Sequence, residues 1–319
     1  MIVDLLPTEE QTLIGDSVAG LLQKLPVERL RDQANFYGAA EAAMWDGFRA
    51  IGLFSLSLPE DAGGAGLGFA EECLCARLLG NALTSPDVLA TMLAVRFAFG
   101  TGDAKLAAAL QSGETRACFA SADDVERAQI VDGRQASYAL SWRRADASLW
   151  RFEPGAVQHC LDETILLRNA TPSGKRANAE GFALRARIAV AAYLVGVAEA
   201  VRDMAVAYAG AREQFGQPIG AFQAVKHACA DMAVRAEAAM AQTWFAALAL
   251  DHGGGEEDAA AAQVLAIQAA LENARANVQV HGGMGFTYEC DAHFYLKRAH
   301  VFAALNANDA VVRAMLLNR

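Results

Sequence analysis

Two short segments in the C-terminal half of the chain carry residue types suited to holding an anionic ligand. The first runs from Arg212 to Gln223 (REQFGQPIGAFQ) and places a guanidinium and an aromatic ring beside a polar turn. A guanidinium binds phosphate oxygens through its planar fork of N–H donors. The same residues also suit a solvated loop between two bundle helices. The first segment by itself leaves both interpretations open.

The second segment runs from Gln279 to Phe286 (QVHGGMGF) and places glycines at the end of a predicted helix. Glycine in such a place is usually a helix C-cap, because it adopts positive φ freely. The adjacent Gly282 and Gly283 also let a ligand approach the backbone closely. The glycine-rich stretch from Leu58 to Gly68 follows no strand, so it predicts a structural loop and not a phosphate site.

Composition limits the classes of function. The chain has 319 residues, of which 54% are hydrophobic, and a formal charge of 27 − 37 = −10. This composition excludes a disordered protein, and the acidic excess argues against nucleic-acid or anionic-membrane binding. The N-terminus (MIVDLLPTEEQ) lacks the basic region of a secretory signal, and no apolar run is long enough to span a bilayer. We expect a cytoplasmic protein. Its six scattered cysteines predict reduced thiols, with no disulfide framework and no metal site.

The elements that must position the two segments follow from the hydrophobic pattern. The first part of the chain is helical in pattern and begins with a capping box at Thr8 (TEEQ). Short alternating runs between about 116 and 175 predict a small antiparallel sheet. The polar stretch from Asn169 to Gly181 predicts a linker, and four long helices follow from Phe182.

This order of elements predicts an α+β fold that is mainly α, because helices and strands are segregated along the chain. We expect an N-terminal helical domain over 1–115 and a shortened middle β-domain with its linker over 116–180. The predicted C-terminal four-helix bundle over 181–319 contains both candidate segments.

Together, the two segments resemble the C-terminal helical domain of the acyl-CoA dehydrogenase family. The family elements RxxFGxxxxxxQ and QxxGGxGF are matched by Arg212, Phe215, Gly216 and Gln223, and by Gln279, Gly282, Gly283, Gly285 and Phe286. The N-terminal LPTEEQ and the glycine loop from Gly52 to Gly68 agree as well. The resemblance covers about 1–115 and 182–300.

The resemblance implies a flavoenzyme that binds FAD and an acyl-CoA thioester and assembles as a homo- or hetero-oligomer, a dimer or tetramer. It implies that a glutamate removes the α-proton while the β-hydride passes to the flavin, and that an electron-transfer flavoprotein accepts the electrons. It also implies a set of contacts to the FAD of a neighbouring subunit, at Arg212, Gln214, Phe215, Gln223, Gln279, Gly282 and Gly283.

Fewer of the family's substrate-binding and catalytic positions are matched than of its FAD-contacting positions. Arg187, which is 25 residues before Arg212, matches a family position beside the substrate, although it would equally suit a charge on a helix surface. The position of the catalytic glutamate falls on Asn306, which cannot act as a general base, and a second family position falls on Ala186. Asp309 is a nearby carboxylate, for which a solvated helix charge is the simpler interpretation.

The middle region is also short and lacks the family's flavin-contacting pieces, apart from a reduced match at Ser141 and Trp142. We therefore expect a component of an FAD-dependent acyl-CoA dehydrogenase of fatty acid or steroid catabolism. This component would supply the neighbour-side FAD contacts, as the non-catalytic partner does in heteromeric bacterial members. The alternatives are a homomeric enzyme with a non-standard base such as Asp309, and a helical scaffold that has lost flavin and catalysis.

Overall fold

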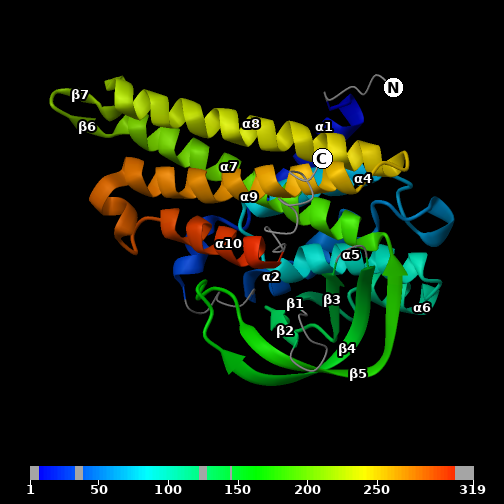
Figure 1. The fold of residues 1–319 in the computed structure, drawn as a ribbon. Coiled ribbons are helices and arrows are strands. Elements are labelled where there is room, and N and C mark those ends of the chain that lie inside the picture. The colour runs from blue at the N-terminus through cyan, green and yellow to red at the C-terminus, as the bar shows by residue number, and fades with distance from the viewer. Residues whose placement is uncertain (1–6, 33–38, 122–127, 144–145, 306–319) are drawn as a thin grey trace.

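The chain folds into a long helical bundle and a β-barrel, with the N-terminal helices packed against both (Figure 1). This computed structural model describes residues 7–32, 39–121, 128–143 and 146–305. The predicted mainly helical fold with a small middle β region is confirmed. None of the helices in the described ranges is long and apolar enough to cross a bilayer.

The N-terminal helices begin with the predicted capping box. The amide of Gln11 donates to Thr8 Oγ1 (3.2 Å), and the amide of Thr8 donates to Gln11 Oε1 (2.9 Å). Helix α5 is buried on nearly every side, so it lies inside the molecule between the bundle and the barrel (Figure 1). The helices of this region are α1 (Glu9–Leu22), α2 (Ala39–Ala43), α3 (Trp45–Ala50), α4 (Phe69–Asn81), α5 (Pro86–Gly100) and α6 (Ala104–Gln111).

The glycine-rich loop before α4 is structural, as its sequence predicts. A Cβ atom at Gly64 would lie 2.1 Å from the carbonyl oxygen of Leu58, so only glycine fits there. The carbonyl of Gly63 accepts a hydrogen bond from Gln111 Nε2 at 2.8 Å, which ties the loop to α6.

Five strands form a closed barrel in the order β1-β2-β5-β4-β3. The prediction of a purely antiparallel sheet is wrong, because β1 and β3 pair in parallel, with Ala117 opposite Tyr138. This pairing closes the barrel and leaves no free edge between these two strands. The strands are β1 (Ala117–Ser121), β2 (Ala128–Val131), β3 (Tyr138–Arg143), β4 (Asp146–Gln158) and β5 (Leu167–Glu180).

The predicted linker between Asn169 and Gly181 is also wrong, because this stretch is most of β5. Its residues pair antiparallel with β4 on one side, and Ala170 pairs with Ala128 of β2 on the other. Much of the strand is exposed or half-buried, which explains its polar sequence. Pairing on both edges therefore overrides a composition that favours a loop.

The four predicted C-terminal helices are confirmed. A hairpin of two short strands, β6 and β7, joins the first two, and the short 3-10 helix η7 follows the third. Because consecutive helices run antiparallel, the end of α7, the start of α8 and the end of α9 meet at one end of the bundle, shown on the left in Figure 1. The elements are α7 (Phe182–Ala211), β6 (Glu213–Gln214), β7 (Gln217–Pro218), α8 (Gln223–Asp251), α9 (Glu256–His281), η7 (Gly282–Phe286) and α10 (Ala292–Leu305).

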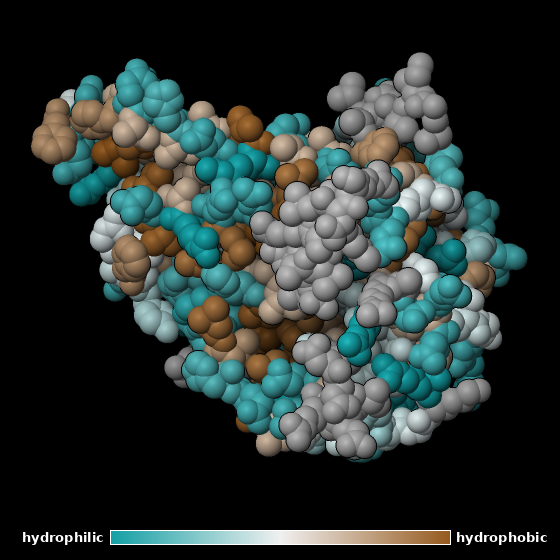
Figure 2. All heavy atoms as spheres, in the orientation of Figure 1, coloured by the Kyte–Doolittle hydropathy of each residue, from teal (hydrophilic) through white to brown (hydrophobic). Residues whose placement is uncertain are grey.

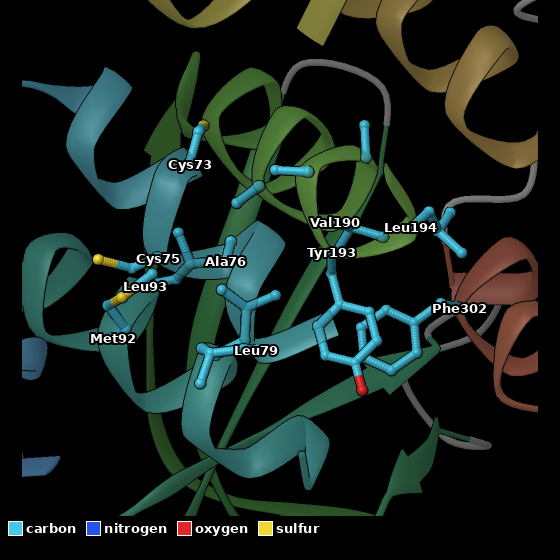
Figure 3. Close-up of a cluster of buried hydrophobic side chains, with 14 of the residues drawn as sticks. Cys73, Cys75, Ala76, Leu79, Met92, Leu93, Val190, Tyr193, Leu194 and Phe302 are labelled. Atoms are coloured by element: carbon cyan, nitrogen blue, oxygen red, sulfur yellow. The ribbon is translucent and has the colours of Figure 1, made fainter. Parts of the chain in front are cut away.

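The core packs closely where α7 crosses α4 and α10. The rings of Tyr193 and Phe302 stack with centroids 3.9 Å apart (Figure 3). A Cβ atom at Gly196 would lie 1.8 Å from the carbonyl oxygen of Arg77, so glycine lets α7 approach α4 closely. The free thiols of Cys73 and Cys75 lie in the same buried cluster (Figure 3).

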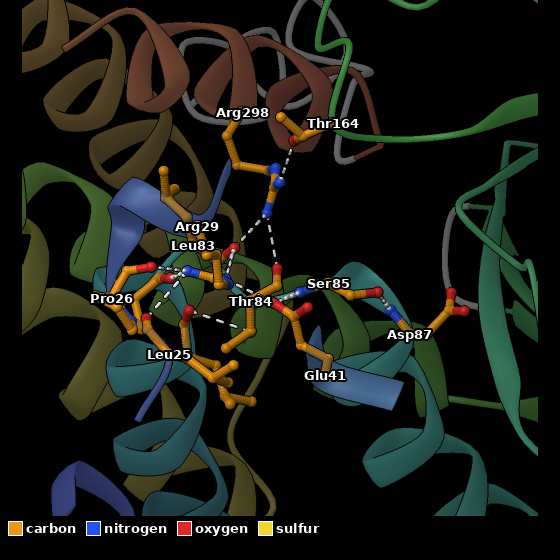
Figure 4. Close-up of polar contacts among 12 residues, drawn as sticks. Leu25, Pro26, Arg29, Glu41, Leu83, Thr84, Ser85, Asp87, Thr164 and Arg298 are labelled. Atoms are coloured by element: carbon orange, nitrogen blue, oxygen red, sulfur yellow. Dashed lines mark hydrogen bonds and ion pairs between the residues drawn. The ribbon is translucent and has the colours of Figure 1, made fainter. Parts of the chain in front are cut away.

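A buried arginine on α10 connects all three regions of the chain (Figure 4). Arg298 Nε donates to Asp162 Oδ2 (2.7 Å), and its Nη1 donates to the carbonyl of Thr84 (2.7 Å) and to the hydroxyl of Tyr193 (2.9 Å). Its Nη2 donates to Thr164 Oγ1 (2.9 Å). We call these five residues the Arg298 junction. It holds the N-terminal helices, the segment before β5 and the bundle together through groups that are fully paired.

Candidate functional site

The first candidate segment begins where α7 ends. The amide of Arg212 donates to the carbonyl of Tyr208 (2.8 Å), and the carbonyl of Arg212 accepts from the amide of Ile219 (2.7 Å). These two bonds fix the backbone of Arg212 at the base of the β6–β7 hairpin. Its side chain is exposed and makes no ion pair with any residue of the described ranges. The guanidinium is therefore available to an external anion.

The tip of the hairpin presents an aromatic ring to solvent. Phe215 adopts a φ of +53° and is 92% exposed, and Gly216 follows with a φ of +81°. The Phe215 ring meets Phe222 edge-on, with centroids 6.1 Å apart. Gln214 and Gln223 are both exposed beside it. A bulky residue with positive φ and almost complete exposure is strained and poorly hydrated, which is typical of a residue that is covered when a partner binds.

In the second segment, the backbone at the glycine pair has free space around it. Gly282 has a φ of +60°, and a Cβ atom at Gly282 or Gly283 would meet nothing within 4 Å. Gly285 differs, because a Cβ there would lie 2.5 Å from the carbonyl oxygen of Val278. The glycine pair therefore leaves space for a ligand, whereas Gly285 is required for packing. The side chain of Gln279, one turn before the pair, is exposed.

A ring stack brings the two segments together. Tyr208 on α7 stacks on His281 at the end of α9 with centroids 4.1 Å apart, and His281 Nδ1 contacts the carbonyl oxygen of Asn277 (2.9 Å). Tyr208 precedes Arg212 by one helical turn. We call the group formed by Tyr208, Arg212–Gln223 and Gln279–Phe286 the motif end. Sequence reasoning missed Tyr208, although its place four residues before Arg212 on a predicted helix was a usable signal.

The surface of the motif end is partly apolar. Phe286 is 81% exposed and Met284 is 50% exposed, and Tyr288 just beyond them is also exposed. Figure 2 shows hydrophobic residues interspersed with hydrophilic ones at the end of the bundle that carries β6 and β7. Exposed aromatic side chains beside polar ones are typical of an interaction surface.

The residues of the motif end fit a group such as FAD, held from one side. A guanidinium and three exposed glutamine amides supply hydrogen-bond donors for a diphosphate and for polar ring atoms, and two open glycines leave room for close approach. The aromatic rings supply apolar contact. Because these side chains lie on an open surface, the opposite side of the ligand requires another surface.

Arg187 lies elsewhere, near the other end of α7. It is 6% exposed, and its Nε donates to Gln263 Oε1 (2.8 Å) on α9. Burial lowers the pKa of Arg187, and Glu256 opposes this shift from a distance of 3.8 Å. The interpretation of Arg187 as a charge on the helix surface is therefore wrong. At a rise of about 1.5 Å per residue, Arg187 and Arg212 are about 37 Å apart along the helix, so they do not share one binding surface.

The catalytic positions remain predictions. Asn306 and Asp309 lie outside the residues that the structure describes, and Ala186 is fully buried in α7. In the barrel, Ser141 Oγ accepts a hydrogen bond from Trp150 Nε1 (3.1 Å), and the Trp142 ring lies edge-on to Phe119 at 5.5 Å. Both of these side chains therefore have packing roles within the chain.

Comparison with known proteins identifies the family. Family models for the N-terminal and C-terminal domains of acyl-CoA dehydrogenase match residues 8–107 and 173–319. The acyl-CoA dehydrogenase IpdE2 of Mycobacterium tuberculosis is 32% identical, over 94% of this chain and 93% of that protein. The chain belongs to the acyl-CoA dehydrogenase family. Acyl-CoA dehydrogenases are FAD-dependent oxidoreductases, which agrees with the fit of the motif end to FAD.

Two further matches define the extent of the similarity. The acyl-CoA dehydrogenase FadE34 of M. tuberculosis is 35% identical over 92% of this chain, but the match covers only 45% of FadE34, so this chain spans less than half of that relative. The ChsE4–ChsE5 complex from M. tuberculosis has the same fold, with a TM-score of 0.84, 20% identity and 98% coverage of both chains.

Proposed function

We propose that this acyl-CoA dehydrogenase chain supplies one half of an FAD site whose other half belongs to a second, unlike acyl-CoA dehydrogenase subunit. The complete site would oxidise the Cα–Cβ bond of an acyl-CoA thioester. The observation that carries this proposal is the motif end, where every FAD-contacting position implied by the family has an exposed side chain or an open glycine backbone. A half-site needs this arrangement, because the ligand must lie between two subunits.

Each part of the motif end has a task in this proposal. The Arg212 guanidinium neutralises the diphosphate of FAD, and the amides of Gln223 and Gln279 donate hydrogen bonds to polar atoms of the same group. The backbone at Gly282 and Gly283 allows close approach. Bound FAD would supply the acceptor for the hydride that leaves the β-carbon of the thioester. Phe215 and Phe286 lose their exposure when the second subunit covers them.

The sequence around the missing base favours an unlike partner. Asn306 stands where the family places a glutamate, and Ala186 stands at the second family position. Neither side chain can remove a proton, so the partner would supply the general base. The ChsE4–ChsE5 structure, with the same fold, is a complex of two differently named chains. An electron-transfer flavoprotein is the proposed electron acceptor.

Visible absorption of the purified protein tests the half-site. The chain is purified alone and together with a co-expressed acyl-CoA dehydrogenase subunit that retains the glutamate. We expect a colourless chain alone and a yellow complex that oxidises acyl-CoA. A yellow, active chain alone would contradict the proposal and favour a homomeric enzyme. Colourless protein in both preparations would favour a scaffold without flavin.

A pair of variants tests the role assigned to Arg212 within the complex. Arg212→Ala should release flavin from the complex, because it removes the cation that faces the diphosphate. Arg151→Ala is the control, since Arg151 is also exposed but lies on barrel strand β4. Equal flavin retention in the two variants would show that Arg212 does not hold the cofactor.

A further inference from the structure

A second candidate site lies at the opposite end of α7 from the motif end. It is a cavity of about 280 Å³ between the end of α5, the end of β5 and the first turn of α7. Its volume is close to the lower limit for small-molecule sites, about 300 Å³. Because α7 has 30 residues, the two sites are about 45 Å apart along the helix. The lining includes Arg96, Phe97, Gly100, Phe182, Arg185 and Leu250.

Arg96 is a cation at this cavity that has no acidic partner among the described residues. Among the described residues it forms no hydrogen bond or ion pair, and its guanidinium lies 5.8 Å from the centroid of the Phe99 ring. The side chain is only partly exposed, and burial together with the charge of Arg185 lowers the pKa of Arg96. An anion in the cavity would offset both effects.

The two acidic groups that influence the charge of Arg96, Glu72 and Asp251, already have other partners. Glu72 accepts from Arg185 Nη1 (2.7 Å) and from the hydroxyl of Ser57. Asp251 accepts from the amide of Phe69 (2.8 Å), where it caps α4. These acids raise the pKa of Arg96 only from a distance. Glu180, the acidic residue in the cavity lining, is exposed to water.

The first turn of α7 adds a second feature that favours anions. Gly181 is the N-cap, with a φ of +77°, and no side chain caps the amides that follow it. Gly181 and Phe182 both line the cavity. The free amides and the positive end of a long helix attract phosphate oxygens.

We propose that this cavity binds an organic phosphate. The phosphate lies between the Arg96 guanidinium and the first turn of α7, and the organic part packs against Phe97, Phe182 and Leu250. A guanidinium and a helix N-terminus together favour phosphate, since both present several N–H donors to its oxygens. The lining also contains apolar side chains, which an inorganic ion would leave uncovered.

A second cavity of similar size also has an arginine in its lining, but that arginine has a carboxylate partner. It has a volume of about 370 Å³ and is lined by Arg49, Gln111 and residues of the loop before α4. There, Arg49 Nη2 already pairs with Asp46 Oδ1 at 3.3 Å. Arg49 therefore serves as a matched control, since it is a cation at a cavity that has its own carboxylate partner.

Calorimetric titration of the full-length chain tests the proposal with three probes, namely coenzyme A, AMP and inorganic phosphate. We expect coenzyme A and AMP to bind more tightly than inorganic phosphate. We also expect Arg96→Gln to weaken both by about tenfold or more, because it removes a charged hydrogen-bond donor. Arg49→Gln should leave both affinities unchanged. Arg96→Gln should not destabilise the fold, since Arg96 has no acidic partner to lose.

The probes also separate the sources of the phosphate. If coenzyme A binds in an Arg96-dependent way and AMP does not bind, the result would support a site for the thioester side of the reaction. If both bind in an Arg96-dependent way, the result would support a general nucleotide phosphate site. Equal binding of inorganic phosphate would overturn the assignment of an organic ligand. If Arg96→Gln leaves the affinities for coenzyme A and AMP unchanged, the assignment of the site is wrong. None of these outcomes depends on flavin, so the half-site at the motif end is tested separately.

Discussion

Two parts of helix α7 have opposite properties. From Ala186 to Ala198 every residue is buried, and Tyr193 takes part in the Arg298 junction. From Val206 onward most residues are exposed, and the helix ends in the motif end. One continuous helix therefore carries a part that maintains the fold and a part that is free to bind. The difference teaches that substitutions can change stability and recognition separately in this chain.

The largest difference in the free energy of unfolding is expected between substitutions of two arginines, one buried and one exposed. Arg298→Met should lower the free energy of unfolding by about 3–5 kcal/mol, because it leaves buried Asp162 without its cationic partner. Arg212→Met, at the exposed end, should change it by less than about 0.5 kcal/mol. Urea denaturation of the lone chain measures both values. Similar losses for the two variants would show that the motif end also maintains the fold.

The second largest difference in stability is expected between alanine substitutions at two glycines. Gly196→Ala should cost about 1–3 kcal/mol, because the added methyl group meets the backbone of α4 and forces the helices apart. Gly283→Ala should cost less than about 0.5 kcal/mol, because its Cβ meets nothing within 4 Å. Thermal unfolding provides the comparison. A stable Gly196→Ala variant would mean that the contact between α4 and α7 can relax.

The buried interior between α5 and the barrel should also make stability depend on pH. Asp87, at the start of α5, and Asp132, directly after β2, are both buried; Asp132 accepts from the Ser85 hydroxyl, and Asp87 accepts from the amide of Gly133 (3.0 Å). Burial raises the pKa of Asp132 from 3.8 to about 6, although the hydrogen bond from Ser85 opposes the shift. Burial and the charge of Asp132 raise the pKa of Asp87 as well.

The sign of the pH dependence follows from these raised values. The folded chain holds these protons more tightly than the unfolded chain, so the free energy of unfolding should fall as pH rises from about 4 to above 6. Asp132→Asn should make this fall shallower, because it removes one of the titrating groups. Asp231→Asn, on the exposed face of α8, should leave it unchanged. Denaturation at a series of pH values would contradict the assignment if Asp132→Asn and the parent chain have equal slopes.

The smallest effect on stability is expected at Phe215. Phe215→Ser should change the free energy of unfolding by less than about 0.5 kcal/mol, because the ring is 92% exposed. The same substitution should weaken assembly with the partner subunit, since it removes an aromatic contact. Size-exclusion chromatography of mixed subunits measures the assembly. An unchanged complex would remove Phe215 from the interface.

Local patterns predict the helices well. The capping box at Thr8 and the loop before α4 both depend on interactions within a few residues, and the structure agrees with each. The β-barrel depends on pairing between distant segments. The polar residues of β5 and the parallel pairing of β1 with β3 carry no local signal, so the sequence predicts a linker and an antiparallel sheet instead.

The same distinction applies to the candidate site. Residue types and spacing predict Arg212, Gln223 and the glycine pair, and antiparallel helices then bring both segments to one end of the bundle. The stack of Tyr208 on His281 requires the packing of α7 against α9, which no short pattern contains. The burial of Arg187 has the same origin, because Gln263 is 76 residues away in the chain.

The buried cysteines have a practical consequence for following how this molecule opens. Cys73 lies in the N-terminal helices, Cys118 in the barrel and Cys290 next to α10, and all three are buried free thiols. Burial raises the pKa of Cys73 and of Cys118, so little reactive thiolate is present while the chain is folded. The rate at which a thiol reagent labels each position therefore reports the opening rate of its own region. Comparing the labelling rates of the three thiols therefore shows whether these regions unfold together or in sequence.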